Sequence, residues 1–132
     1  MNKQNNLDIL PVNFRHEKKF LKENNLDNWE ILNNLSDIDI NYLLKNNSLC
    51  TESRLKKIRA IALFIIKLDL TPYQAYILLH SGIGSLRTLS TLNPHSLKQK
   101  IGRLERKMQT RTKVEINQKL LKHWIMKSRN LI

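Results

Sequence analysis

Cationic side chains are concentrated in the last third of this 132-residue sequence. Residues 85–132 contain 12 lysines and arginines against 2 acidic residues, a net charge of +10. Residues 1–84 contain 11 against 9, a net charge of only +2. A one-signed field of this kind attracts phosphate-rich partners, chiefly nucleic acid. The alternative is a solvated basic surface, but solubility alone does not explain why the charge lies on one side.

A second chemical signal is the stretch Ser81-Gly82-Ile83-Gly84-Ser85, which holds two of the three glycines of the chain. Glycine can adopt a positive φ, and because it lacks a Cβ its backbone can approach a ligand closely. We expect a tight turn between two short helices, with Ile83 in the core. The free N–H groups of Gly84 and Ser85 would start the next helix and bind one phosphate. The alternative is an interhelical turn that binds nothing.

The candidate phosphate-binding set combines this turn with the cations that follow it. Contacts with about six phosphates would make the logarithm of the DNA-binding constant fall with log salt at a slope of roughly −5. Binding would be largely independent of base sequence, because phosphate contacts position a protein without specifying bases. The full set is Ser81, Gly82, Ile83, Gly84, Ser85, Arg87, Lys98, Lys100, Arg103, Arg106, Lys107, Arg111 and Lys113.

Capping residues predict that helices position these side chains. The segments 71–74 and 112–115 both have the capping-box pattern, in which a Thr is followed by Gln or Glu three residues later. Asn93 precedes a proline, and Ser36 precedes acidic residues that suit the helix dipole. We expect helices at 14–24, 27–34, 37–46, 52–68, 72–81, 85–91, 94–108 and 113–128. The helix at 94–108 should be amphipathic, with its cations opposite Leu97, Ile101, Leu104 and Met108.

The sequence also repeats itself. With a shift of 57 residues, residues 25–44 align with residues 82–101, and Ser36 falls on Asn93 as a helix cap. Two more residues of shift align the helix at 52–68 with the helix at 113–128. We therefore predict an all-α protein of about eight short helices, arranged as two four-helix units in one compact domain. The segments are a tail at 1–12, a first unit at 13–70 and a second, basic unit at 71–132.

The glycine turn resembles the helix-hairpin-helix family. The resemblance rests on Ser81–Ser85 with flanking apolar residues at Leu78, Leu79, Leu86 and Leu89. It implies two tandem helix-hairpin-helix units that hold the DNA sugar-phosphate backbone without reading its sequence, as in repair and recombination proteins. The layout is also similar to that of small cyanobacterial and plastid proteins of unknown function.

The sequence departs from the family pattern in both units. DNA-binding hairpins often carry Lys or Arg two places after the second glycine, where this chain has Leu86. The first unit has Asn25, Leu26 and Asp27 in place of the glycine turn. Asn25 can adopt the left-handed conformation that the turn requires. Asp27 would repel a phosphate, so we expect the first hairpin to be degenerate and structural.

The remaining residues point away from catalysis. The four histidines and the single Cys50 lack metal-ligand spacing, and no nucleotide-binding motif is present. The longest apolar run, at 60–66, is too short to span a bilayer, and the N-terminal residues lack the apolar core of a signal peptide. We predict a non-enzymatic protein with no cofactor, metal or membrane contact. Its expected location is the cytoplasm, on the nucleoid, or a plastid stroma.

Other partners stay open beside duplex DNA. Ile116, Leu120 and Trp124 form an apolar row at i, i+4, i+8, which either completes the core or meets another chain. In the second case the protein would be a protein-interaction adaptor. RNA or ribosome association is a weaker alternative, since a ribosomal protein of the small subunit uses such a hairpin. An enzyme acting on DNA is the weakest.

Overall fold

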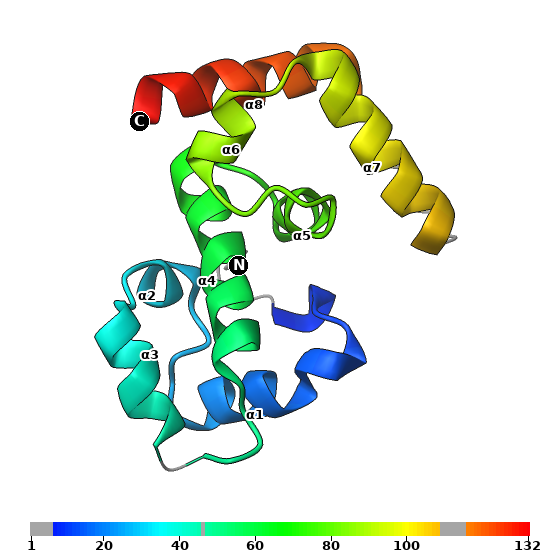
Figure 1. Cartoon of the computed structure of the whole chain (residues 1–132). Coiled ribbons are helices and arrows are strands. Elements are labelled where there is room, and N and C mark those ends of the chain that lie inside the picture. Colours follow the sequence, from blue (N-terminus) through cyan, green and yellow to red (C-terminus); the bar gives the residue numbers. More distant parts are fainter. Residues whose placement is uncertain (1–6, 46, 109–115) are drawn as a thin grey trace. The chain divides into compact units, whose positions relative to one another are not determined.

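The computed structural model describes residues 7–45, 47–108 and 116–132, without the side chains of residues 107 and 108. Within these ranges every regular element is helical, so the all-α prediction is confirmed (Figure 1). Two 3-10 helices, η2 (Leu7–Ile9) and η3 (Val12–Phe14), precede eight α-helices. The eight are α1 (Arg15–Glu23), α2 (Trp29–Asn33), α3 (Asp37–Leu44), α4 (Glu52–Leu68), α5 (Pro72–His80), α6 (Leu86–Ser90), α7 (Pro94–Met108) and α8 (Gln118–Leu131).

The helix boundaries agree with the capping signals except at α8. The first seven helices begin and end within two residues of the predicted ranges. The predicted helix at 113–128 was wrong at both ends, because α8 begins at Gln118 and ends at Leu131. The predicted capping box at 112–115 lies outside the described residues. Asn117 is the observed cap, since its side chain accepts a hydrogen bond of 2.9 Å from the N–H of Leu120.

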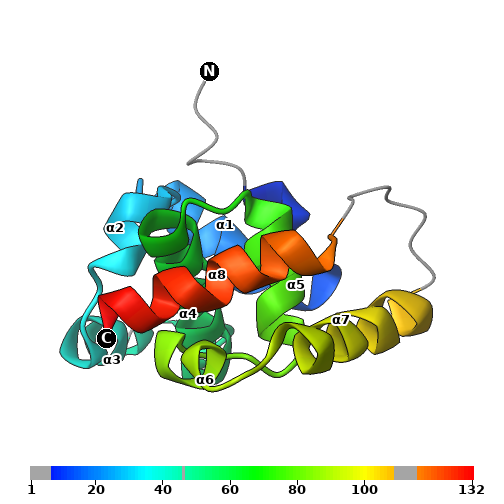
Figure 2. The same ribbon diagram turned by 90° about the horizontal axis from the view of Figure 1, so that it is seen from above.

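The chain divides into two compact units, unit 1 (Met1–Tyr76) and unit 2 (Ile77–Ile132). In unit 1, α4 packs against α2 and α3 (Figure 1). In unit 2, α8 packs against α6 and α7 (Figure 2). Each unit therefore contains one helix that packs against the two helices immediately before it in the chain. Among the largest fully buried side chains are Trp29, Phe64, Ile58 and Ile61 in unit 1, and Trp124, Ile77, Leu78 and Ile83 in unit 2.

The 57-residue repeat is present in the backbone. We call α1–α4 repeat 1 and α5–α8 repeat 2. Counted with this shift, α1 and α2 begin and end at the residues equivalent to those of α5 and α6, and α3 begins where α7 begins. The turns after α1 and α5 also match. Leu26 N–H donates to Leu21 C=O over 2.8 Å, and Ile83 N–H donates to Leu78 C=O over 3.1 Å.

These bonds form the Schellman ending of a helix, which requires a left-handed residue just after the helix. That residue is Asn25 in repeat 1, with φ of 58°, and Gly82 in repeat 2, with φ of 96°. The expectation that Asn25 would keep the turn without a glycine is confirmed.

The predicted alignment of the last helices is wrong. The caps Thr51 and Asn117 differ by 66 residues, whereas the sequence comparison used a shift of 59. The physical reason is the length of α7, which has 15 residues against 8 in α3. The segment after α7 is also two residues longer than the segment after α3. The extra length of α7 carries Arg103 and Arg106, whereas Lys98 and Lys100 lie in the part equivalent to α3.

Candidate functional site

The turn between α5 and α6 needs a glycine at only one of its two glycine positions. Gly82 has the positive φ that disfavours other residues. Gly84 does not, and a Cβ added at either position would meet no atom within 4 Å. Gly84 therefore leaves open surface beside the backbone. The Ile83 side chain is 1% exposed, as expected for a core residue that pins the turn.

Ser85 connects this turn to α6. Its hydroxyl accepts a hydrogen bond of 3.1 Å from the N–H of Thr88 and so caps the helix. Within the described part of the chain, the N–H groups of Gly84 and Ser85 donate no hydrogen bond. However, α6 has only five residues, and such a short helix supplies little macrodipole. Attraction for an anion must therefore come chiefly from cationic side chains nearby.

Helix α7 supplies those cations, and the helix is amphipathic. Asn93 caps the helix, since its side chain accepts a hydrogen bond of 2.8 Å from the N–H of Ser96. Leu97 and Ile101 are buried and Leu104 is half-buried, which confirms the predicted apolar stripe for these residues. The side chain of Met108 lies outside the description. The exposed cations of the helix are Lys98, Lys100, Arg103 and Arg106.

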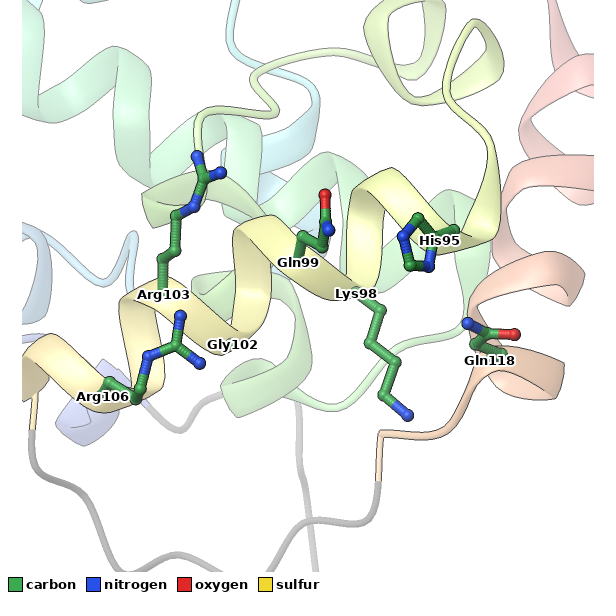
Figure 3. Close-up of a pocket in the computed structure, with 7 residues that line it drawn as sticks. All are labelled: His95, Lys98, Gln99, Gly102, Arg103, Arg106 and Gln118. Carbon is green, nitrogen blue, oxygen red and sulfur yellow. The ribbon is translucent and has the colours of Figure 1, made fainter.

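A depression of about 570 Å³ runs along the polar face of α7 to the start of α8 (Figure 3). Lys98 extends away from α7 in this view, and Gln118 lies at the start of α8 beside it. Arg106 folds back over Gly102, with its Nη1 atom 3.6 Å from the position that a Cβ of Gly102 would take. The lining residues are His95, Lys98, Gln99, Gly102, Arg103, Arg106 and Gln118.

A second depression, of about 260 Å³, lies between the hairpin and α7. It is lined by His80 and Ser81 from the end of α5 and the turn, and by Lys100, Arg103 and Leu104 from α7. Arg103 lines both depressions. Of the predicted turn residues, Ser81 alone lines a depression together with the basic helix, and the residues at 82–85 line neither depression. The structure thus brings the start of the turn, but not Gly84 or Ser85, to the cations of α7.

The cations of this surface are not neutralised by neighbours. Among the described residues, Arg87 and the four exposed cations of α7 form no ion pair. In unit 1, by contrast, Arg59 lies 2.8 Å from Asp37 and Arg54 lies 3.9 Å from Glu17. Among the described residues that line the two depressions, none is acidic. The positive potential of unit 2 is therefore available to a ligand.

Several predicted site residues lie apart from the depressions or outside the description. Arg87 is exposed on α6 but lines neither depression. Lys107 belongs to α7, although its side chain is outside the description, and Arg111 and Lys113 lie outside the described residues altogether. The sequence analysis missed His95, Gln99, Gly102 and Gln118. The first three recur at i, i+4 and i+7, a spacing that places them on one helix face.

The apolar row proposed as an alternative contact is not one exposed helix face. Trp124 is 2% exposed, Leu120 is half-buried, and Ile116 precedes the first residue of α8. Burial of Trp124 favours the interpretation in which this row completes the core.

Two other features bear on the kind of site. None of the helices in the described ranges is long and apolar enough to cross a membrane. Among the described side chains, no group of three or more His, Cys, Asp or Glu residues is placed to hold a metal ion.

A family model for a domain of unknown function, DUF4332, matches residues 11–131. The chain belongs to the DUF4332 family. The DUF4332 match covers the hairpin, α7 and all of α8, so both depressions fall within the family domain. Comparisons with curated proteins and with solved structures find no match.

Proposed function

We propose that this protein is a non-enzymatic nucleic-acid-binding protein that holds the phosphate backbone of duplex DNA without sequence specificity. The observation that carries the proposal is the position of Arg103, which lines both depressions and so links the hairpin to the basic face of α7. Its guanidinium group is always charged and can donate several hydrogen bonds to phosphate oxygens. A protein of this kind would act where nucleic acid is found, in the cytoplasm or a plastid stroma.

The charge distribution supports a phosphate ligand. Unit 2 contains 12 lysines and arginines against 2 acidic residues, and the described cations on its surface have no ion-pair partners. Lysine and arginine contacts to phosphate release counterions, so we expect binding to weaken steeply with salt. Few aromatic residues are present, which disfavours a platform on which single-stranded bases stack.

The turn geometry supports the tandem helix-hairpin-helix interpretation as part of the same proposal. Both repeats have a helix, a left-handed residue, a buried or half-buried apolar residue and a capped second helix. We propose that repeat 2 is the binding hairpin, since Asp27 occupies in repeat 1 the place of Gly84. A carboxylate at that position would repel a phosphate.

The first experiment measures binding to a labelled 20-base-pair duplex of random sequence between 50 and 200 mM salt. We expect the double variant Lys100→Glu, Arg103→Glu to lose at least a hundredfold in affinity, because two phosphate contacts become repulsive. The matched control is Lys57→Glu, Lys67→Glu, which changes the net charge equally at exposed positions of α4. Equal losses in the two variants would show that only the total charge matters. No binding by the wild type at 50 mM salt would overturn the proposal.

A second experiment tests the hairpin itself. Gly84→Glu introduces a negative charge into open space, so the turn should fold normally. We expect it to weaken duplex binding about tenfold, since a like charge near a bound phosphate costs from about 1 kcal/mol in water to about 4 kcal/mol at a protein surface, and tenfold corresponds to about 1.4 kcal/mol. Gly84→Gln is the control of matched shape, and it should bind within about twofold of the wild type. If Gly84→Glu binds as tightly as Gly84→Gln, the hairpin is structural and α7 acts alone. An RNA duplex of the same sequence, run in parallel, shows whether the deoxyribose backbone is preferred.

A further inference from the structure

Gly102 occupies a position in α7 that helix formation does not explain. Glycine is the poorest helix former after proline, and Gly102 lies in the ninth position of a 15-residue helix. It is not at a helix end, and its φ is not positive. A Cβ at this position would meet only Arg106 Nη1, at the ordinary contact distance of 3.6 Å. Packing therefore leaves room for an alanine, so neither the helix nor its neighbours require a glycine here.

The surroundings of Gly102 suggest what the missing side chain permits. Gly102 lines the larger depression together with Lys98, Arg103 and Arg106 (Figure 3). Two of these cations flank it along the helix, and Arg106 reaches back over it. A glycine in such a place lets a ligand approach the backbone closely. The cations on its rim select an anionic ligand.

Arg103 extends this argument to the neighbouring depression. Arg103 also lines the depression that Ser81 and Lys100 line, so its guanidinium group belongs to two depressions that attract anions. Arginine presents five N–H donors in a planar fork, enough to bond to two phosphate groups at once. A ligand that fills both hollows must therefore carry at least two neighbouring phosphates.

We propose that a phosphodiester backbone passes directly over Gly102, with one phosphate in each depression and Arg103 between them. The ligand class is an oligonucleotide strand with consecutive phosphates rather than an isolated phosphate ion. This proposal rests on the nucleic-acid function proposed above. It adds one specific point on α7, Gly102, where the nucleic-acid strand comes close to the protein backbone. The side chains of the hairpin do not provide this contact.

The test compares Gly102→Leu with its smaller control, Gly102→Ala. Both residues favour the helix, so each variant should melt higher than the wild type, by about 3 °C. We expect Gly102→Leu to bind a random 20-base-pair duplex at least tenfold more weakly, because its side chain occupies the path of the strand. Gly102→Ala should lose no more than about threefold. A more stable protein with weaker binding cannot be explained by damage to the fold.

The outcomes separate this inference from the proposed function. If the wild type binds the duplex and Gly102→Leu binds it equally well, the close approach is wrong and the function stands. If the wild type does not bind, both fail. A second measurement needs no variant: the backbone amide signals of 15N-labelled protein are followed by NMR as a 10-base-pair duplex is added. The Gly102 signal should be among the most shifted in α7, and an unmoved Gly102 signal beside shifted Lys98 and Lys100 signals would overturn the inference.

A third measurement tests the requirement for two phosphates. Inorganic phosphate and the dinucleotide pTpT compete separately against the labelled duplex on the wild-type protein. We expect pTpT to displace the duplex at a concentration at least tenfold below that of inorganic phosphate. The Gly102→Leu variant should reduce this advantage. Equal potency of the two competitors would overturn the inference that the two depressions act together.

Discussion

Repeats 1 and 2 share a backbone but present different chemistry at equivalent positions. Ile38 and Tyr42 on α3 correspond to His95 and Gln99 on α7, and both α3 side chains are strongly exposed, at 79% and 70%. The α7 residues at these positions line the cationic depression. The same backbone plan therefore carries different surface residues in the two repeats, because exposed helix faces are free to diverge while the buried ones hold the fold.

The two units also differ in what their cations do. In unit 1, Arg59 bonds to Asp37 and to the carbonyl of Leu35, so this cation stabilises the end of α2 and the start of α3. A depression of about 440 Å³ in the same unit is lined in part by Glu30 and Asp69. In unit 2 the charged side chains that line the two depressions, as far as the chain is described, are lysines and arginines. Similar scaffolds thus hold four cation–carboxylate pairs in the described part of unit 1 and none in the described part of unit 2.

The largest expected effect is on the free energy of unfolding, when the apolar residue of each turn is truncated. Ile83 is 1% exposed, whereas Leu26 at the equivalent position is only half-buried. We expect Ile83→Ala to lower the free energy of unfolding by about 3 kcal/mol and Leu26→Ala by about 1 kcal/mol, because the cost of truncation grows with burial. Urea unfolding followed by circular dichroism measures both. Equal losses would mean that the two turns are supported in the same way, against the observed burial.

Exchange of the two turns tests whether backbone and surface are separable. The five residues Ser81–Ser85 are replaced by the repeat 1 sequence Asn-Asn-Leu-Asp-Asn. Because Asn25 and Asn28 already support the same turn and cap in repeat 1, we expect the helix content to be unchanged. Duplex affinity should fall roughly tenfold, since the exchange introduces a carboxylate at the position of Gly84. The reciprocal exchange at residues 24–28 is the control and should leave affinity within twofold. A reciprocal exchange that changes affinity as strongly would show that both hairpins bind.

A smaller change in stability is expected when the left-handed residue of each turn is substituted. The change should have opposite signs in the two repeats. Gly82→Ala forces a Cβ into a φ of 96° and should destabilise the protein by about 1 kcal/mol. Asn25→Gly removes a Cβ from a φ of 58° and should be neutral or stabilise slightly. Thermal unfolding of the two variants measures both signs. Destabilisation by Asn25→Gly would contradict the equivalence of the turns.

Local signals in the sequence predicted most of the fold. The caps Ser36, Thr71 and Asn93 each accept the expected hydrogen bond, and the helices they begin start at the predicted residues. The α8 boundary was missed because Thr112 and Asn117 are both good caps, and capping preference alone does not choose between them. Packing of α8 against α6 and α7 depends on contacts distant in the sequence.

The candidate site could be predicted only in outline. The composition of residues 85–132 showed where the excess positive charge lies, and Gly82 and Gly84 showed where the turn between α5 and α6 lies. What the sequence could not show is that Arg103 stands between two depressions, since this depends on how α7 packs beside the turn. Gly102 was visible as the third glycine, but its meaning required knowledge of which helix face is exposed.

The smallest expected effect is a difference in acid sensitivity at the start of α3 and α7. The hydrogen bond from Arg59 to Asp37, helped by the charges of Lys56 and Arg59, holds the pKa of the Asp37 carboxyl below its usual value of 3.8. The equivalent residue in repeat 2 is Pro94, which has no titratable group. Because the pKa is lowered in the folded state, Asp37 stabilises the fold above its usual pKa. This contribution is lost as the pH falls through the lowered value.

A carbon-detected NMR titration of the Asp37 carboxyl group measures this pKa directly. We expect the wild-type midpoint below 3.8 and an upward shift toward that value in Arg59→Gln, which removes both the hydrogen bond and one charge. Asp37→Asn should lose part of the pH dependence of urea unfolding below pH 4, while duplex affinity at neutral pH stays the same. A midpoint that does not move in Arg59→Gln would mean that the ion pair exerts no force on Asp37 in solution.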